Sequence, residues 1–160
     1  MGPDVKAAYS TALRMLTRRE HCEAEVRQKL EAKGFDEIAT DSAIEELKNY
    51  GYLSDARFAE AFLRYRTKRG EALWMAAAKA RQKGVDESAL QQAVEEAEAG
   101  FNALDACREL LQSRDPGRLR RDDERVWQRH ARFLRNKGYD AGTILRVLNE
   151  ADTELNEEEE

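Results

Sequence analysis

The sequence is poor in residues that interrupt helices, and it lacks segments that would anchor a chain in a membrane. Only two of its 160 residues are proline, and both lie outside the stretches with helical periodicity. No apolar run approaches the roughly 18 residues that a membrane-spanning helix needs. No signal peptide is visible either. These absences favour an all-α fold and a soluble, cytoplasmic protein without a membrane partner.

Cysteine is equally scarce. Cys22 and Cys107 are far apart and neither belongs to a CxxC pair, so neither a disulfide framework nor a zinc site is expected. Cys107 shares a helical face with Leu104, Leu110 and Leu111, which predicts a buried thiol. The sequence has no Gly-rich phosphate loop and no nucleophile motif. We therefore predict that the protein is not an enzyme and has no cofactor, no metal and no catalytic residue.

The histidines and the paired carboxylates give no support to catalysis. His21 precedes a helix in a tight turn, whereas His130 lies far away within another helix. We expect surface or capping roles for both. Adjacent carboxylates such as Glu45 and Glu46 diverge on a helix, so they predict a solvated face and not a convergent site.

One four-residue pattern occurs three times. The segments 33–36, 83–86 and 137–140 each read Lys-Gly-apolar-Asp, and their glycines are 50 and 54 residues apart. Lys suits the last turn of a helix, Gly accepts a left-handed conformation, and Asp caps the next helix. One such joint is common, but three at near-constant spacing indicate an internal repeat.

Apolar periodicity between these joints predicts nine helices. We expect them to form three tandem three-helix repeats in an elongated, curved array without a sheet. The expected repeats are residues 4–51, 52–99 and 100–151, and residues 152–160 are expected to form an acidic, disordered tail. In the third helix, Ile38, Ile44 and Leu47 are expected to face inward.

Charge is segregated along the chain, although the net charge is only −5. Residues 64–83 carry seven Lys or Arg and one Glu, and residues 118–137 carry eight against three acids. Such densities suit DNA phosphates or an acidic protein surface. The alternative is that they only solubilise helices through pairs with Glu four residues away. The candidate contact residues are Arg64, Arg66, Lys68, Arg69, Lys79, Arg81, Lys83, Arg118, Arg120, Arg121, Arg129, Arg132 and Arg135.

Two aromatic residues lie among these bases and could stack on nucleic acid. Core packing is the preferred prediction for Tyr65, whereas Trp74 is left open between the core and the surface.

The segment 51–59 reads GYLSDARFA and resembles the GYLDDxRFA pattern of the RecX family of bacterial recombination regulators. Further similarity lies in EVRQKLEAKGF (25–35), RQKGV (81–85) and RFLRNKGY (132–139). The resemblance extends over nearly everything from Ala8 to Leu148. The chain departs from the pattern at Cys22, where a Ser cap is usual, and at Ala80, where Leu is usual. With Ala76–Ala78 also small, the second repeat is expected to have a thinner core, or to be filled by Leu73, Trp74 and Met75.

The resemblance implies three three-helix repeats and a role in DNA recombination and repair. RecX-like proteins bind the RecA filament on single-stranded DNA and inhibit ATP hydrolysis, strand exchange and filament growth. The resemblance therefore implies RecA as partner. The negative net charge predicts only weak binding to single-stranded or double-stranded DNA, and we expect a monomer. The basic stretches taken alone support an alternative, a stand-alone helical module that binds nucleic acid. A purely structural adaptor also stays open.

Overall fold

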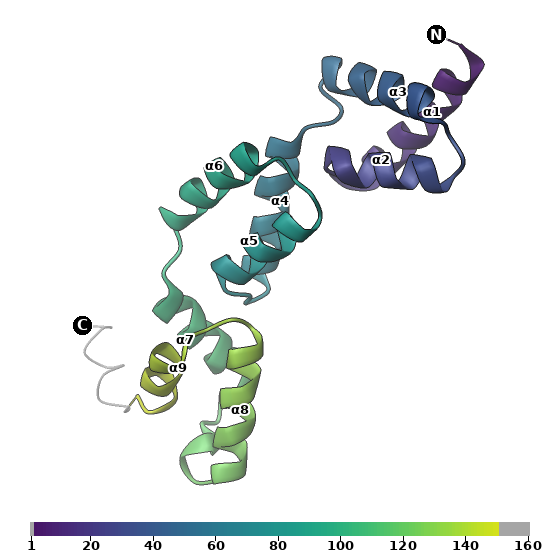
Figure 1. Cartoon of the computed structure of the whole chain (residues 1–160). Coiled ribbons are helices and arrows are strands. Elements are labelled where there is room, and N and C mark those ends of the chain that lie inside the picture. The colour runs from purple at the N-terminus through teal and green to yellow at the C-terminus, as the bar shows by residue number, and fades with distance from the viewer. Residues whose placement is uncertain (1, 151–160) are drawn as a thin grey trace.

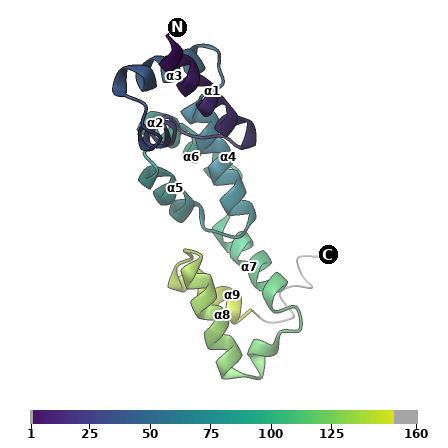
Figure 2. The same cartoon turned by 90° about the vertical axis from the view of Figure 1, so that its right-hand side faces the viewer.

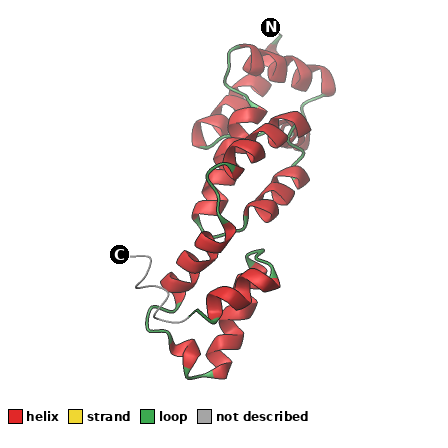
Figure 3. Ribbon diagram, turned by 90° about the vertical axis from the view of Figure 1, so that its left-hand side faces the viewer, coloured by secondary structure: helices red, strands yellow, loops and turns green. Residues whose placement is uncertain are grey.

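The computed structural model describes residues 2–150, and these residues form an elongated, gently curved array of helices without a strand (Figures 1 and 3). The helices are α1 (Pro3–Arg18), α2 (Glu23–Ala32), α3 (Glu37–Asn49), α4 (Asp55–Lys68), α5 (Leu73–Gln82), α6 (Glu87–Glu98), α7 (Ala103–Arg114), α8 (Glu124–Asn136) and α9 (Ala141–Leu148). A 3-10 turn, η1 (Leu119–Arg121), precedes α8. The predicted fold class is confirmed. No helix of this part of the chain is long and apolar enough to cross a membrane.

The helices pack in three groups, α1–α3, α4–α6 and α7–α9, which follow one another along the array (Figures 1 and 2). Each group surrounds its own cluster of buried apolar side chains. The residue boundaries proposed above between the repeats stay a prediction. The proposed tail and Ala151, the expected end of the last helix, lie outside the described residues.

The three Asp residues of the joints cap the helices that follow them, as predicted. Asp36, Asp86 and Asp140 each accept a hydrogen bond from a backbone N–H in the first turn of the next helix, at 2.8 to 3.0 Å. A capping carboxylate satisfies an N–H that has no partner within the helix, and its charge suits the positive end of the helix dipole. These short-range interactions explain why α3, α6 and α9 begin where they do.

The second and third joints also hold neighbouring repeats together. Gly84 has φ of +86°, and a Cβ built there would lie 2.8 Å from the Cβ of Ala24 at the start of α2. Gly138 lies in the same way against Ala72 and Met75 at the start of α5. Gly is thus required twice over at both joints, by its backbone conformation and by close packing. A joint docks against the second helix of the preceding repeat.

Hydrogen bonds at these contacts follow the same plan. The Cys22 thiol donates to the carbonyl of Lys83, and the Ala72 N–H donates to the carbonyl of Lys137. The Cys22 N–H still donates to the Glu25 carboxylate at 3.4 Å. Cys therefore replaces the usual Ser where its side chain serves the contact between the first two repeats.

Asp55, which belongs to the GYLSDARFA segment, makes a further link between the first two repeats. One carboxylate oxygen accepts from the Glu23 N–H at the start of α2, at 2.8 Å. The other accepts from the Asp86 N–H just before α6, at 2.7 Å. The half-buried side chain of Asp55 therefore joins α4 to α2 of the first repeat and to the start of α6 in its own repeat.

The second repeat compensates for its small fifth helix. Ala80 is fully buried where the first repeat has Leu30, also fully buried. Phe58 and Phe62 lie 50 residues after Ala8 and Ala12, and the centroids of their packed rings are 5.5 Å apart. Large side chains on α4 thus face small ones on α5, and the first repeat reverses this arrangement. A thinner core, or one filled by Leu73, Trp74 and Met75, was predicted, but Phe58 and Phe62 of α4 fill it together with Leu73, and Trp74 is exposed.

One inward-facing residue was predicted wrongly. Ile38 is 77% exposed, whereas Ile44 and Leu47 are buried. The buried face of α3 continues through Thr40 and Ala43, three or four residues apart. Ile38 lies six residues before Ile44, about 240° around the helix, and so it points away from that face.

Candidate partner and nucleic-acid interface

The predicted contact residues divide into two groups. Some form ion pairs or hydrogen bonds with other residues of the protein, and the others are exposed to solvent. The first group is tied to a few carboxylates. Glu71, only 6% exposed, receives Lys79 at 2.6 Å and Arg66 at 3.3 Å. The single acid of the segment 64–83 thus forms ion pairs with two of its seven bases, so Lys79 and Arg66 have a structural role.

Two more members of this group, Arg81 and Lys83, form ion pairs with carboxylates of other helices. Arg81 pairs with Glu87 at 3.2 Å on the surface between α5 and α6. Lys83 lies 3.7 Å from Glu25 and therefore links the second joint to α2 of the preceding repeat. Both side chains remain accessible, but part of their charge is already balanced.

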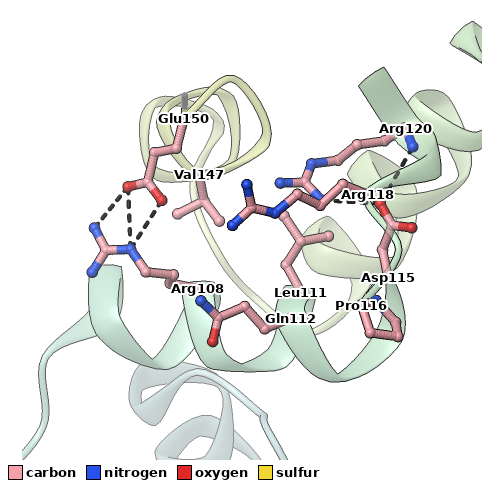
Figure 4. A pocket seen from close by; sticks show the side chains of 9 residues that line it. All are labelled: Arg108, Leu111, Gln112, Asp115, Pro116, Arg118, Arg120, Val147 and Glu150. Carbon is pink, nitrogen blue, oxygen red and sulfur yellow. Dashed lines mark hydrogen bonds and ion pairs between the residues drawn. The ribbon is translucent and has the colours of Figure 1, made fainter. Parts of the chain in front are cut away.

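Arg120 is not a surface contact residue, which corrects the prediction. It is 8% exposed, and its guanidinium donates to Asp115 at 2.9 Å (Figure 4). The guanidinium also donates to the Leu148 carbonyl at 3.2 Å. Asp115 also accepts from the Leu119 N–H at 2.9 Å. Burial raises the pKa of Asp115, but the hydrogen bonds from Arg120 and Leu119 outweigh it and hold the pKa below its usual value.

The buried pair lines a small cavity of about 280 Å³ between α7, η1 and the end of α9 (Figure 4). Arg108 closes its other side through an ion pair of 2.6 Å with Glu150. Arg118 also lines it, in the left-handed conformation with φ of +55°. Arg121 donates to the Glu150 carbonyl at 2.9 Å. The arginines that follow the Asp-Pro-Gly turn therefore hold the third repeat together, a role that their charge density alone did not predict.

Both histidines are buried, contrary to the expected surface role, whereas the capping role also expected fits His21, which contacts the carbonyl of Arg19 at the end of α1. His130 lies 3.8 Å from Asp115, while His21 has one ring nitrogen 3.0 Å from the Arg19 carbonyl and the other 3.3 Å from the Lys29 ammonium. Burial lowers the pKa of both, which favours the neutral ring. A neutral His21 that donates to Arg19 and accepts from Lys29 satisfies both nitrogens.

The exposed bases of the first stretch form what we call the α4 basic surface: Arg64, Lys68 and Arg69. Tyr65 accompanies them and is 58% exposed, contrary to the predicted core packing. The Arg69 guanidinium lies 4.2 Å from the centre of its ring. The side chain was expected in the core because it is large and apolar, but Phe58, Phe62 and Leu63 already occupy the inner face of α4.

The exposed bases of the second stretch form the α8 basic surface: Arg125, Arg129, Arg132 and Arg135. Their spacing of four, three and three residues places them on one side of α8. Three of them line a shallow hollow of about 430 Å³ together with Glu124 and Gln128. Within residues 2–150, none of these four guanidinium groups forms an ion pair, so this surface retains its full positive charge.

Within the described residues, no group of three or more His, Cys, Asp or Glu side chains is placed to hold a metal ion. Burial raises the pKa of both Cys22 and Cys107 to about 11, so these thiols stay protonated near neutral pH. The predicted burial of Cys107 is confirmed. Fold and surface together define a helical tandem-repeat protein with exposed cationic helix faces.

Comparison with known proteins gives the family. A profile of the first three-helix domain of RecX matches residues 8–47, and a profile of the second three-helix domain matches residues 54–94. The chain belongs to the RecX family. It is 32% identical over 145 residues to the "Regulatory protein RecX" of Syntrophotalea carbinolica, covering 89% of this chain and 95% of that relative.

A second relative supports this assignment, and a solved structure is similar in fold. The chain is 33% identical over 151 residues to the "Regulatory protein RecX" of Halorhodospira halophila, covering 94% of this chain and 92% of that protein. The crystal structure of RecX from Lactobacillus salivarius superposes with a TM-score of 0.72 at 19% identity, covering 96% of this chain and 99% of that one. That structure shares the fold with this chain.

Proposed function

We propose that this protein binds the RecA filament on single-stranded DNA and restrains its ATP hydrolysis, strand exchange and growth. Membership of a family of regulatory proteins supports a regulator, and RecA is the partner that the family resemblance implies. The observation that carries the proposal is the α8 basic surface on an elongated array (Figure 1). The array acts as a monomer in the cytoplasm, with repeats at 4–51, 52–99 and 100–151.

The physical argument rests on length and charge. An elongated protein can contact several neighbouring subunits of a filament at once, so it can oppose the subunit motions or additions that the filament needs. The α8 basic surface and the α4 basic surface would meet DNA phosphates or acidic parts of RecA. The bases tied to Glu71, Asp115 and Glu87 are not part of this proposed contact.

The first experiment measures RecA ATPase on single-stranded DNA as this protein is added. The proposal expects hydrolysis to fall progressively. Unchanged hydrolysis with the protein in clear molar excess over RecA would overturn it. Electron microscopy of the same mixtures then shows whether filaments shorten.

A charge-reversal variant tests the proposed surface itself. Arg125→Glu, Arg129→Glu and Arg132→Glu together should weaken inhibition strongly, because each replaces attraction to phosphate or carboxylate by repulsion. A matched control reverses three exposed cations that lie apart from one another, Lys6, Lys33 and Arg146. Both variants change net charge equally, so equal loss of inhibition would mean that overall charge and not the α8 basic surface decides binding.

A stand-alone nucleic-acid-binding module is the second candidate, because the α8 basic surface carries no internal ion pair. It predicts direct binding to single-stranded DNA without RecA. The logarithm of affinity would fall with the logarithm of salt concentration, with a slope near −0.7 for each phosphate contacted. A net charge of −5 argues that such binding is weak. Binding that is equally strong with and without RecA would favour this candidate.

A further inference from the structure

An open groove with apolar lining runs along the contact between the second and third repeats, and none of the residues that line it belongs to either basic surface. It encloses about 820 Å³ between α5, α6 and the joint that precedes α9. Its apolar lining includes Leu73, Trp74, Val94 and Phe101. Trp74 is 63% exposed, which leaves much of a large indole ring in contact with solvent. Exposed aromatic side chains in a hollow of this size are typical of binding sites.

The groove follows from the small residues of α5. Ala77 and Ala78 line it where the first repeat, 50 residues earlier, carries Arg27 and Gln28. Alanine leaves space above the helix that a longer side chain would fill. The core beneath is complete, because Phe58 packs there in place of a larger residue on α5. The run of alanines therefore shapes a surface and does not weaken the fold.

The groove has a fixed floor that belongs to both repeats. The Trp74 indole N–H donates to the Gly138 carbonyl, and the Tyr139 hydroxyl donates to the Gly70 carbonyl at 2.9 Å. Burial raises the pKa of Tyr139 to about 12, which keeps this donor protonated. An occupant of the groove would find its floor already ordered, which lowers the entropy cost of binding.

The rim of the groove is acidic. Four carboxylates line it, those of Glu87, Glu95, Glu98 and Asp140, against the single guanidinium of Arg81. Arg81 is already paired with Glu87, and α6 itself contains no Lys or Arg. Nucleic acid would be repelled by this rim, whereas a cationic polypeptide would be attracted.

From this combination we propose that the groove is a docking site for a basic amphipathic polypeptide segment of a partner protein. Apolar side chains of the segment pack on Trp74, Val94 and Phe101, while its Lys or Arg side chains face Glu95 and Glu98. The proposal assigns opposite kinds of partner to different faces of one molecule: the α8 basic surface takes anionic groups, and this groove takes a cationic peptide. It does not depend on the identity of the filament partner proposed above.

The test uses a fluorescein-labelled peptide, KKLLKKLLKK, and its acidic counterpart EELLEELLEE as probes. Fluorescence anisotropy with the full chain should show binding of the basic peptide that weakens with salt, and little binding of the acidic one. Trp127→Phe leaves Trp74 as the sole tryptophan of the chain, so a shift of its emission reports occupancy of the groove directly. Failure of the basic peptide to bind, or equal binding of both peptides, overturns the proposal.

Two adjacent residues of α6 provide a matched pair of variants. Glu95 lines this groove, whereas Glu96 lines a neighbouring hollow beside α4 that shares only Leu73 and Phe101 with it. Both are exposed, and each accepts one hydrogen bond from a Gln four residues before it. Glu95→Lys should weaken basic-peptide binding about three-fold or more, and Glu96→Lys should leave it nearly unchanged. Equal weakening by the two variants would show general electrostatic attraction and overturn the groove as the site.

A third variant tests the apolar floor without changing charge. Ala78→Gln places a longer polar side chain into the groove at a partly exposed position of α5, and Gln is a good helix former. The expected result is weaker peptide binding with an unchanged circular dichroism spectrum. Undiminished affinity in this variant would refute a role for the apolar floor.

Discussion

Replacing Arg120 by Ala should destabilise the protein, although the residue belongs to a stretch that looks like a solvent-exposed basic surface. The guanidinium is buried and donates to Asp115 and to the Leu148 carbonyl. Removal of one partner of a buried ion pair typically costs about 3–5 kcal/mol, because the other charge stays buried without its counterion. Asp115 keeps backbone donors from Leu119 and Arg120, which favours the lower end, about 3 kcal/mol.

The measurement is urea and thermal unfolding followed by circular dichroism. For a chain of this length, about 3 kcal/mol corresponds to a fall in Tm of roughly 6–12 °C. Arg129→Ala serves as the control, because Arg129 is exposed on α8, and it should change stability by no more than about 0.5 kcal/mol. If both variants lose the same stability, or if Arg120→Ala loses none, the buried pair does not hold the third repeat as argued.

The remaining predictions concern the contacts between repeats and the pH dependence. Gly84→Ala should destabilise by about 1–3 kcal/mol more than Gly34→Ala, because both require a left-handed backbone but only the Gly84 Cβ would meet Ala24; equal losses in urea unfolding would contradict this. Asp55→Ala should cost about 1–3 kcal/mol by removing two hydrogen bonds, one to the Glu23 N–H of the first repeat and one to the Asp86 N–H within the second, and unchanged stability would show that water replaces them. Burial lowers the pKa of His21, so the unfolded chain binds a proton more readily than the folded chain, and stability should fall as pH drops below about 6.5. The Tm of His21→Gln should therefore change less than that of the unaltered protein as the pH is lowered below about 6.5.

Much of the helical framework follows from local interactions that can be predicted from the sequence. The Lys-Gly-apolar-Asp joints predict where helices end and begin, because a left-handed Gly and a capping Asp act over only a few residues. Apolar periodicity predicts the inward faces around Leu47, Leu90 and Leu134, all fully buried. The spacing of Arg125, Arg129 and Arg132 likewise predicts one shared helix face.

The division of the basic residues could not be predicted in this way. Arg120 and Arg129 are alike in the sequence, yet one is buried against Asp115 and the other is exposed. Lys79 and Lys68 differ in the same manner, because Glu71 lies next to only one of them. Whether a cation is neutralised depends on which carboxylate the folded chain brings within a few ångströms, and local spacing does not contain that information.

The sequence by itself therefore determined the helical repeats, their joints and the density of positive charge. The tertiary structure decided that the joints are also the contacts between repeats, with Gly84 and Gly138 packed against the second helix of the preceding repeat. It also decided that the alanines of α5 open a groove, since only the packed arrangement shows that Phe58 fills the core beneath them while Trp74 stays exposed. Local hydrogen bonds and dipoles act within a few residues, whereas burial and charge pairing depend on segments that meet only when the chain is folded.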